Sequence, residues 1–100
     1  MFIGKVTGSV VATQKIASVA GLKLLLVQAY NIKDGALVET PRTAVAVDTL
    51  GAGEGEFVLV TQGSSARLTD RTKSVPTDAV IVGIIDAMQE GTREIYKKSN

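Results

Sequence analysis

Residues 48–56 read Asp-Thr-Leu-Gly-Ala-Gly-Glu-Gly-Glu, and the fold has to accommodate this stretch. Three glycines alternate with other residues over Gly51–Gly55, between the apolar runs Thr43–Asp48 and Phe57–Gln62. A phosphate-binding loop also uses such glycines, but it leads into a helix and usually carries a Lys and a Ser or Thr. Here the run leads into a strand, and its two glutamates would repel phosphate. We therefore interpret it as a tight turn between strands, in which glycine permits positive φ angles.

The rest of the chain reads as short β-segments separated by turn residues. The predicted strands are Ile3–Ala12, Leu22–Tyr30, Thr43–Asp48, Phe57–Gln62 and Ala79–Met88, with a short returning strand at Arg93–Lys97. Asp34-Gly35 is a good tight-turn pair, and Leu37–Val38 is a further strand candidate. One helical turn is predicted at Ser65–Thr69, capped by Ser64. The fold class is therefore all-β: a small five-stranded, OB-like β-barrel with one short helix.

The length and composition of the chain argue against several classes of function. A length of 100 residues fits a single domain, residues 1–100. Lys and Arg total 11 and Asp and Glu total 10, without the basic stripe that a nucleic-acid binder needs. The absence of Cys and His removes disulfides, thiol nucleophiles, the usual zinc sites and the commonest general base. The longest apolar runs, Leu24–Val27 and Ala79–Ile85, are too short to span a bilayer. We expect no nucleic acid, membrane, metal or cofactor as a partner.

Three of the predicted strands are apolar on both faces, at Leu24–Val27, Ala44–Val47 and Val80–Val82. In a lone barrel one face of each strand points inward and the other meets water. The chain has almost no helix that could cover the outer face. The pattern therefore predicts that another subunit covers it.

Two groups of polar residues are candidates for chemistry. Asp48, Glu54 and Glu56 could form a carboxylate cluster, but calcium needs six or more oxygens and this spacing matches no known loop. Gly63–Arg67 lacks the second glycine of a nucleophile elbow, and the chain has no His to act as base. We interpret the first group as solvated turn carboxylates and the second as a helix start. The sequence predicts that the chain is not an enzyme.

Five runs in order cover most of the chain: Lys5–Lys15, Gly21–Gln28, Ala46–Val60, Gly63–Arg67 and Pro76–Asp86. Together they resemble the EutN/CcmL family of bacterial microcompartment vertex proteins, and Ala46–Val60 is the most specific of them. The resemblance implies a barrel protomer that assembles as a homopentameric ring. The ring would cap the five-fold vertices of a carboxysome or metabolosome shell within the cytoplasm. Its expected partners are the hexameric shell proteins of the facets, and no catalysis is implied.

The resemblance also implies where the subunits meet. We expect Asp48–Gly55 and Gly63–Arg67 to lie at subunit contacts or near the central axis, where five backbones crowd together and only small side chains fit. The candidate residues are Asp48, Gly51, Ala52, Gly53, Glu54, Ser64, Ser65 and Arg67.

Two other functions stay open. An OB-fold module that binds a ligand or nucleic acid is the alternative, although that class needs aromatic stacking platforms and a positive groove. The aromatic residues are scattered along the sequence, at Phe2, Tyr30, Phe57 and Tyr96. A small-molecule passage at the ring centre is compatible with the vertex role.

Overall fold

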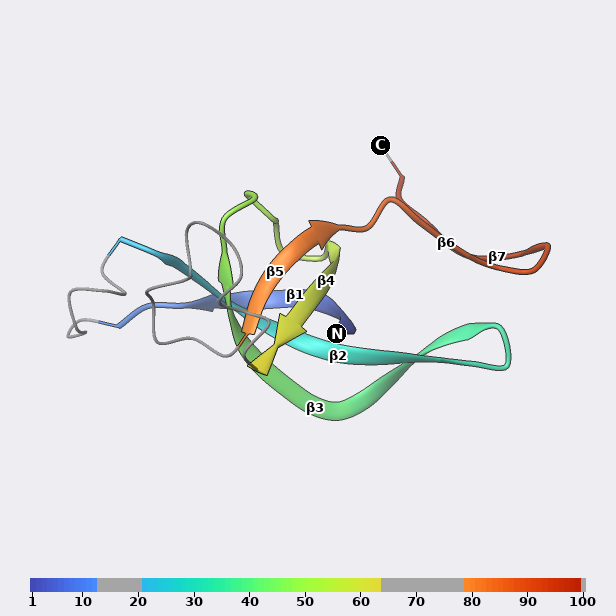
Figure 1. Cartoon of the computed structure of the whole chain (residues 1–100), viewed down its shortest axis with the longest axis horizontal. Helices are drawn as coiled ribbons and strands as arrows, with labels where there is room; N and C mark the ends of the chain where they lie inside the picture. The colour runs from blue at the N-terminus through green and yellow to red at the C-terminus, as the bar shows by residue number, and fades with distance from the viewer. Residues whose placement is uncertain (13–20, 64–78, 100) are drawn as a thin grey trace.

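The computed structural model of the chain describes residues 1–12, 21–63 and 79–99. Its strands are β1 (Phe2–Val10), β2 (Lys23–Lys33), β3 (Ala36–Asp48), β4 (Phe57–Gln62), β5 (Ala79–Ile84), β6 (Ala87–Glu90) and β7 (Arg93–Lys97). Five strands close into a barrel in the order β1-β2-β3-β5-β4, and β6 pairs with β7 in a separate hairpin (Figure 1). The all-β class and the five-stranded barrel are confirmed. The predicted helix Ser65–Thr69 lies outside the described residues.

The barrel closes through one parallel pairing. β3 and β5 run parallel at Val47–Val80 and Asp48–Ile81, whereas the other neighbouring strands in the barrel are antiparallel. Nine buried side chains fill the interior as one cluster: Val6, Leu25, Val27, Ala46, Ala52, Val58, Val60, Ala79 and Ile81. Every member is aliphatic, and most are β-branched residues, which suit strands. Eight of these residues lie on strands, and Ala52 alone comes from a loop.

β3 is longer than the sequence predicts. It begins at Ala36 rather than Thr43 and continues through Pro41, which lacks the amide that a strand normally donates. The β2–β3 register shifts at this point, between Gln28 and Tyr30. Gln28 Nε2 donates to the carbonyl of Arg42 at 3.0 Å, and Thr40 Oγ1 donates to the carbonyl of Ala29 at 3.0 Å. Side chains thus bond carbonyls at the bulge and let the strand pass the proline.

The prediction of one strand over Ala79–Met88 is wrong. β5 ends at Ile84 and β6 begins at Ala87. Between them, the Ile85 amide donates to the carbonyl of Phe57 at 2.9 Å, and the Lys98 amide donates to the carbonyl of Asp86 at 2.8 Å. The chain leaves the barrel here, because β6 takes β7 as its partner instead of β4. A continuous apolar run does not reveal such a change of partner.

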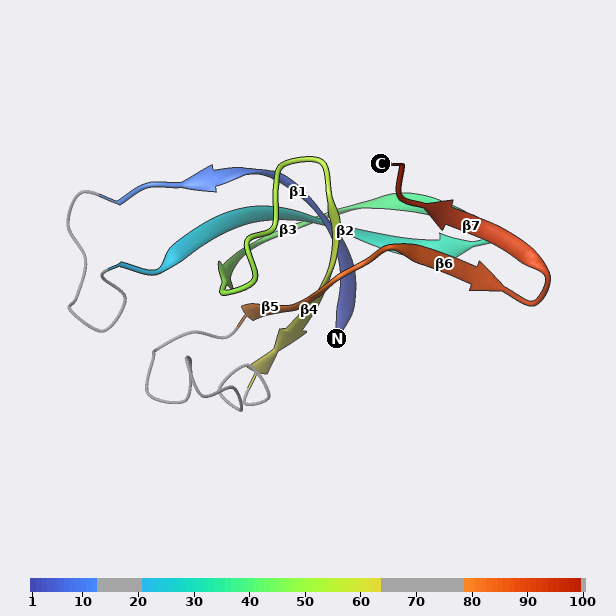
Figure 2. The same ribbon diagram turned by 90° about the horizontal axis from the view of Figure 1, so that it is seen from above.

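Two hairpins extend side by side from the barrel and form an arm, which comprises the β2–β3 tip and the β6–β7 hairpin (Figures 1 and 2). Arg93 Nη1 donates to the carbonyl of Asp34 in the β2–β3 turn at 3.1 Å. At the base of the arm, the Phe57 ring packs edge-to-face on Tyr30 and on Tyr96, with centroids 5.1 Å and 4.8 Å apart. These contacts hold the arm against the barrel.

Candidate functional site

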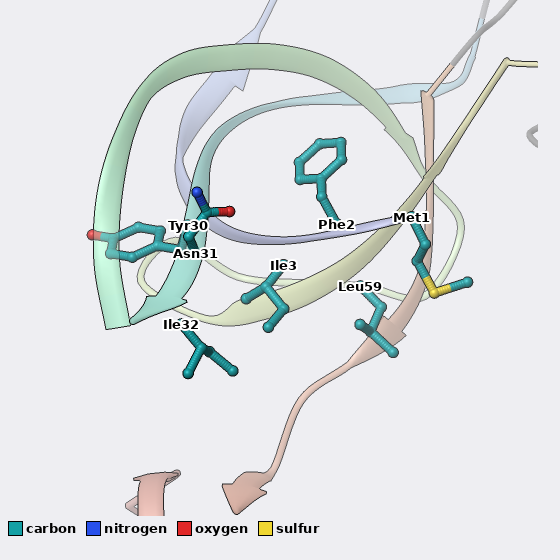
Figure 3. Close-up of a pocket in the computed structure, with 7 residues that line it drawn as sticks. All are labelled: Met1, Phe2, Ile3, Tyr30, Asn31, Ile32 and Leu59. Atoms are coloured by element: carbon teal, nitrogen blue, oxygen red, sulfur yellow. The ribbon is translucent and has the colours of Figure 1, made fainter. Parts of the chain in front are cut away.

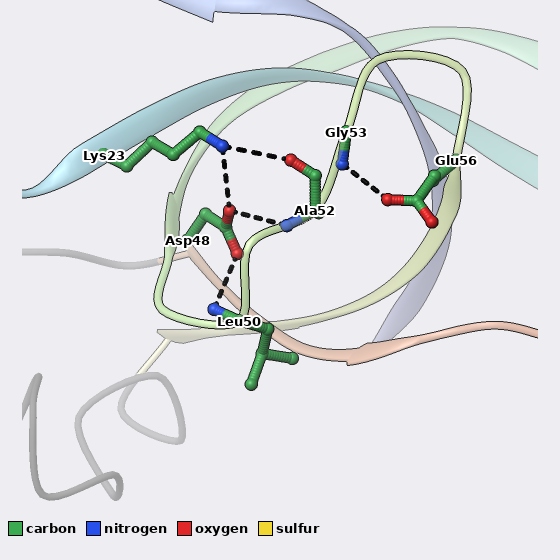
Figure 4. A network of polar contacts seen from close by, with 6 residues as sticks. All are labelled: Lys23, Asp48, Leu50, Ala52, Gly53 and Glu56. Carbon is green, nitrogen blue, oxygen red and sulfur yellow. Dashed lines mark hydrogen bonds and ion pairs between the residues drawn. The ribbon is translucent and has the colours of Figure 1, made fainter.

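The stretch after β3 forms a loop, residues 49–56, that crosses one end of the barrel (Figure 4). Gly51 and Gly55 have φ angles of +85° and +90°, which side-chain-bearing residues rarely adopt. The Gly55 amide donates to the carbonyl of Val6 at 2.8 Å, and the Val6 amide donates to the carbonyl of Glu56 at 2.9 Å. The loop thus continues the pairing of β1 with β4. The predicted positive φ angles are confirmed, but the stretch is a longer loop between strands that do not pair with each other, and not a tight turn.

Asp48 holds this loop in place from within the protein. Its residue is 5% exposed, and its carboxylate accepts hydrogen bonds from two backbone amides. Leu50 N donates to Oδ1 and Ala52 N donates to Oδ2, both at 2.9 Å (Figure 4). Lys23 Nζ lies 3.7 Å from Oδ2 and also donates to the carbonyl of Ala52 at 3.2 Å. A carboxylate that is buried with these partners fixes the loop conformation.

The Ala52 side chain points from the loop into the interior of the barrel and fills one end of it. It is 1% exposed and belongs to the barrel's apolar cluster. Its small size therefore has a reason inside the protomer that does not require a neighbouring subunit. Gly51, Gly53 and Glu54, in contrast, are exposed.

A second carboxylate joins the loop to the end of the chain. Glu56 Oε1 accepts from the Gly53 amide at 2.5 Å, and its Oε2 pairs with Lys98 Nζ beyond β7. The bond from Lys98, followed by that from Gly53, lowers the pKa of Glu56 below its ordinary 4.5. The same contact raises the pKa of Lys98 above its ordinary 10.5. Both groups are charged at neutral pH, so the contact is fully formed there.

This pair predicts a pH dependence of stability. Because the pKa of Glu56 is lowered by folding, its contribution is lost as pH falls through the lowered value. The contribution of Lys98, whose pKa is raised, is lost only as pH rises through its raised value. Glu56→Gln should therefore lower the urea midpoint at about pH 7, and it should have less effect at a pH below the lowered pKa of Glu56, where the carboxyl group is protonated. A difference of the same size at both pH values would contradict this assignment. Glu54→Gln, an exposed change on the same loop, is the matched control.

The sequence candidates divide into three groups. Asp48 and Ala52 are buried in the protomer, and the exposed candidates are Gly51, Gly53 and Glu54. The rest lie outside the described residues: Ser64, Ser65 and Arg67. The sequence reading missed the roles of Lys23 and Lys98. The contact between Lys98 and Glu56 joins residues 42 positions apart, so no local pattern could have indicated it.

Among the described residues, the acidic side chains form no group of three that could hold a metal ion. Among the same residues there is no apolar helix of the length needed to cross a membrane. Two of the three carboxylates considered above, Asp48 and Glu56, are engaged with backbone amides and lysines.

Comparison with known proteins identifies the family to which this barrel belongs. The family model of the ethanolamine utilisation protein EutN and the carboxysome matches residues 1–86, which covers the whole barrel. The chain belongs to the EutN/CcmL family. The match ends where the chain leaves β5 for the β6–β7 hairpin.

Several EutN/CcmL relatives match the chain closely. The carboxysome shell vertex protein CcmL of Gloeobacter violaceus is 42% identical over 100 residues, which cover 100% of this chain and 97% of the relative. The solved structure of that CcmL superposes with a TM-score of 0.89 and covers 98% of both chains at 42% identity. The pentameric microcompartment shell protein GrpN of Rhodospirillum rubrum gives a TM-score of 0.77 at 43% identity, covering 92% of this chain and 100% of GrpN. This EutN/CcmL member is therefore a structural microcompartment shell protein and not an enzyme.

Proposed function

We propose that this chain assembles as a homopentamer, occupies the five-fold vertices of a microcompartment shell and abuts hexameric shell proteins of the facets. The observation that carries the proposal is the likeness to pentameric GrpN over the full length of that protein, at 43% identity. Shell vertex proteins of carboxysomes and of other microcompartments match at similar identity. A closed shell built from hexagonal tiles needs five-fold units at its corners, so the role is geometric.

The exposed apolar residues of the barrel support assembly. Leu26 on β2 and Val45 on β3 are 37% and 47% exposed, although each lies in an apolar strand. Their inward neighbours Leu25 and Ala46 are buried, so alternation places Leu26 and Val45 on the outer face. Water contact with such side chains is unfavourable, and a neighbouring subunit would remove it.

The packing of three aromatic rings counts against the alternative of a nucleic-acid or ligand-binding module. Stacking platforms need open aromatic faces. Phe57 is 8% exposed and packs between Tyr30 and Tyr96, so these rings contact one another instead.

Native mass spectrometry of the purified protein at micromolar concentration tests the oligomeric state. We expect a dominant five-subunit peak. A stable dimer or a monomer would contradict the proposal.

The facet partner needs a separate test. We expect the tagged chain to co-purify with a hexamer-forming shell protein of the same genome when the two are co-expressed. Electron microscopy should show closed shells only when both proteins are present. Closed shells formed by the hexameric protein alone would contradict the vertex role.

Gly53, one of the exposed glycines of the loop, gives a further prediction. If the loop lies where five subunits crowd together, Gly53→Leu should reduce the five-subunit fraction in native mass spectrometry. The protomer itself should tolerate this change, since Gly53 is exposed and a Cβ there would lie 3.4 Å from Glu56 Oε1. A fully pentameric Gly53→Leu variant would place the loop away from the subunit contacts.

A further inference from the structure

An apolar groove lies between the barrel and the arm, with a volume of about 370 Å³ (Figure 3). It is lined by the apolar side chains of Met1, Phe2, Ile3, Ile32 and Leu59 and by the polar residues Tyr30 and Asn31. Met1 is 78% exposed and Ile32 is 39% exposed. Five of the seven lining residues have apolar side chains, so most of this surface is suited to another apolar surface.

The floor of the groove is the outer face of the seam between β1 and β4. Ile3 and Leu59 are direct cross-strand partners there, and Ile32 contributes a wall from the arm. On β5, Gly83 is the partner of Leu59. A Cβ at Gly83 would lie 3.6 Å from Leu59 Cδ1, so the absence of a side chain keeps this edge of the groove low.

A second apolar surface lies on the opposite side of the barrel. Leu26 and Val45 are direct cross-strand partners on the outer face of β2 and β3. In the barrel order β1-β2-β3-β5-β4, β3 is separated from the β1–β4 seam by a strand on either side. Gly8, the partner of Leu26 on β1, adds no side chain beside this pair. The Leu26–Val45 pair is thus a low apolar ridge.

A ring with a single rotation axis needs two different surfaces on every subunit, because each contact joins the front of one copy to the back of the next. One self-complementary surface would instead give a dimer. This chain has two apolar surfaces on opposite sides of the barrel. We propose that the Leu26–Val45 ridge of one subunit packs into the Ile3–Ile32–Leu59 groove of the next. The inference rests on the proposed homopentamer and names the surfaces that form it.

Charged substitutions in exposed positions test each surface separately. Val45→Lys should break the ridge and Ile32→Glu should break the groove, and each should convert the five-subunit species to monomer in native mass spectrometry. The matched controls are Val11→Lys and Val38→Glu, at aliphatic positions that are 87% and 42% exposed and line neither surface. Both controls should stay pentameric. Far-UV circular dichroism and thermal melting check that every variant is folded.

Mixing the two variants gives the sharpest result. A Val45→Lys subunit keeps its groove and an Ile32→Glu subunit keeps its ridge, so the mixture should form one-to-one complexes although neither variant associates alone. A ring of five cannot alternate two kinds of subunit, so no closed pentamer should appear. A mixture that stays monomeric would overturn the pairing of these two surfaces.

The double variant Val45→Lys/Ile32→Glu adds a test in a single chain. It should recover the pentamer, because the new ammonium group on the ridge of one copy would face the new carboxylate in the groove of the next, and these opposite charges attract. A folded double variant that is as monomeric as either single variant would contradict the proposed contact.

The outcomes separate this inference from the proposed function. If the unmodified chain is pentameric and both folded single variants remain pentameric, the two surfaces are wrong while the homopentamer stands. Loss of the ring in Val38→Glu as complete as in Ile32→Glu would also overturn the groove. If the unmodified chain is not pentameric, both proposals fall.

Discussion

Asp48→Ala should lower the free energy of unfolding by about 3 kcal/mol, since hydrogen bonds to a charged group each contribute roughly 1.5–3 kcal/mol. The substitution removes the acceptor of both the Leu50 and the Ala52 amides. Ala52 is 1% exposed, so its amide would have no water to replace the carboxylate. The substitution Asp48→Ala would also leave Lys23 without its ion-pair partner. Urea denaturation followed by circular dichroism at a fixed protein concentration measures the effect.

Two further variants separate the hydrogen bonds from the charge. Asp48→Asn keeps one oxygen acceptor but turns a donor toward the other amide, so it should also destabilise, by less than Asp48→Ala. Glu54→Ala removes an exposed carboxylate of the same loop and should change stability by less than about 0.5 kcal/mol. Equal stability of Asp48→Ala and Glu54→Ala would show that Asp48 does not hold the loop.

Gly4→Ala is the second change with a large expected effect, a loss of about 2 kcal/mol from overpacking. A Cβ at Gly4 would overlap Val27 Cγ1 and lie 3.3 Å from the carbonyl oxygen of Gln28. Val27 is 0% exposed and β-branched, so its methyl group has neither space nor an easy alternative rotamer. The barrel closes tightly here because β1 pairs with β2 on one side and β4 on the other.

The same strand supplies the control for this prediction. A Cβ at Gly8 would meet nothing within 4 Å, so Gly8→Ala should be nearly neutral in the same denaturation experiment. In a double-mutant cycle, Val27→Ala should cost less in the Gly4→Ala background than in the unmodified chain, since it removes the overlapping methyl. Additive effects would mean that the cost of Gly4→Ala arises elsewhere.

Much of the strand pattern could be predicted from the sequence. Turn pairs and apolar runs depend on neighbouring residues, so Asp34-Gly35 and the glycine run of the 49–56 loop fall where expected. The start of β3 was misplaced because Gln28 and Thr40 side chains, not a local preference, carry the strand past Pro41. The end of β5 was misplaced because β6 changes partner, which depends on strand pairing far along the chain.

The sequence did not predict what the residues of the 49–56 loop do within the protomer. The carboxylates of Asp48–Glu56 read as solvated turn residues, yet Asp48 is buried and bonded to the loop's own amides. The resemblance explains the small side chain of Ala52 by the crowding of subunits around it. In the structure, Ala52 instead belongs to the apolar interior of the barrel. Burial of these residues depends on which strands close over the loop, and residue type alone does not specify that.

The sequence alone determined the β-rich chain, the positive-φ turn in the 49–56 loop and the apolar character of both strand faces, because each depends on residues within one segment. The tertiary structure decided the parallel closure of β3 on β5, the burial of Asp48 and the pairing of Glu56 with Lys98. It also decided that Ile3, Ile32 and Leu59, from three different strands, line one groove. These features join distant segments, so they exist only once the barrel has closed.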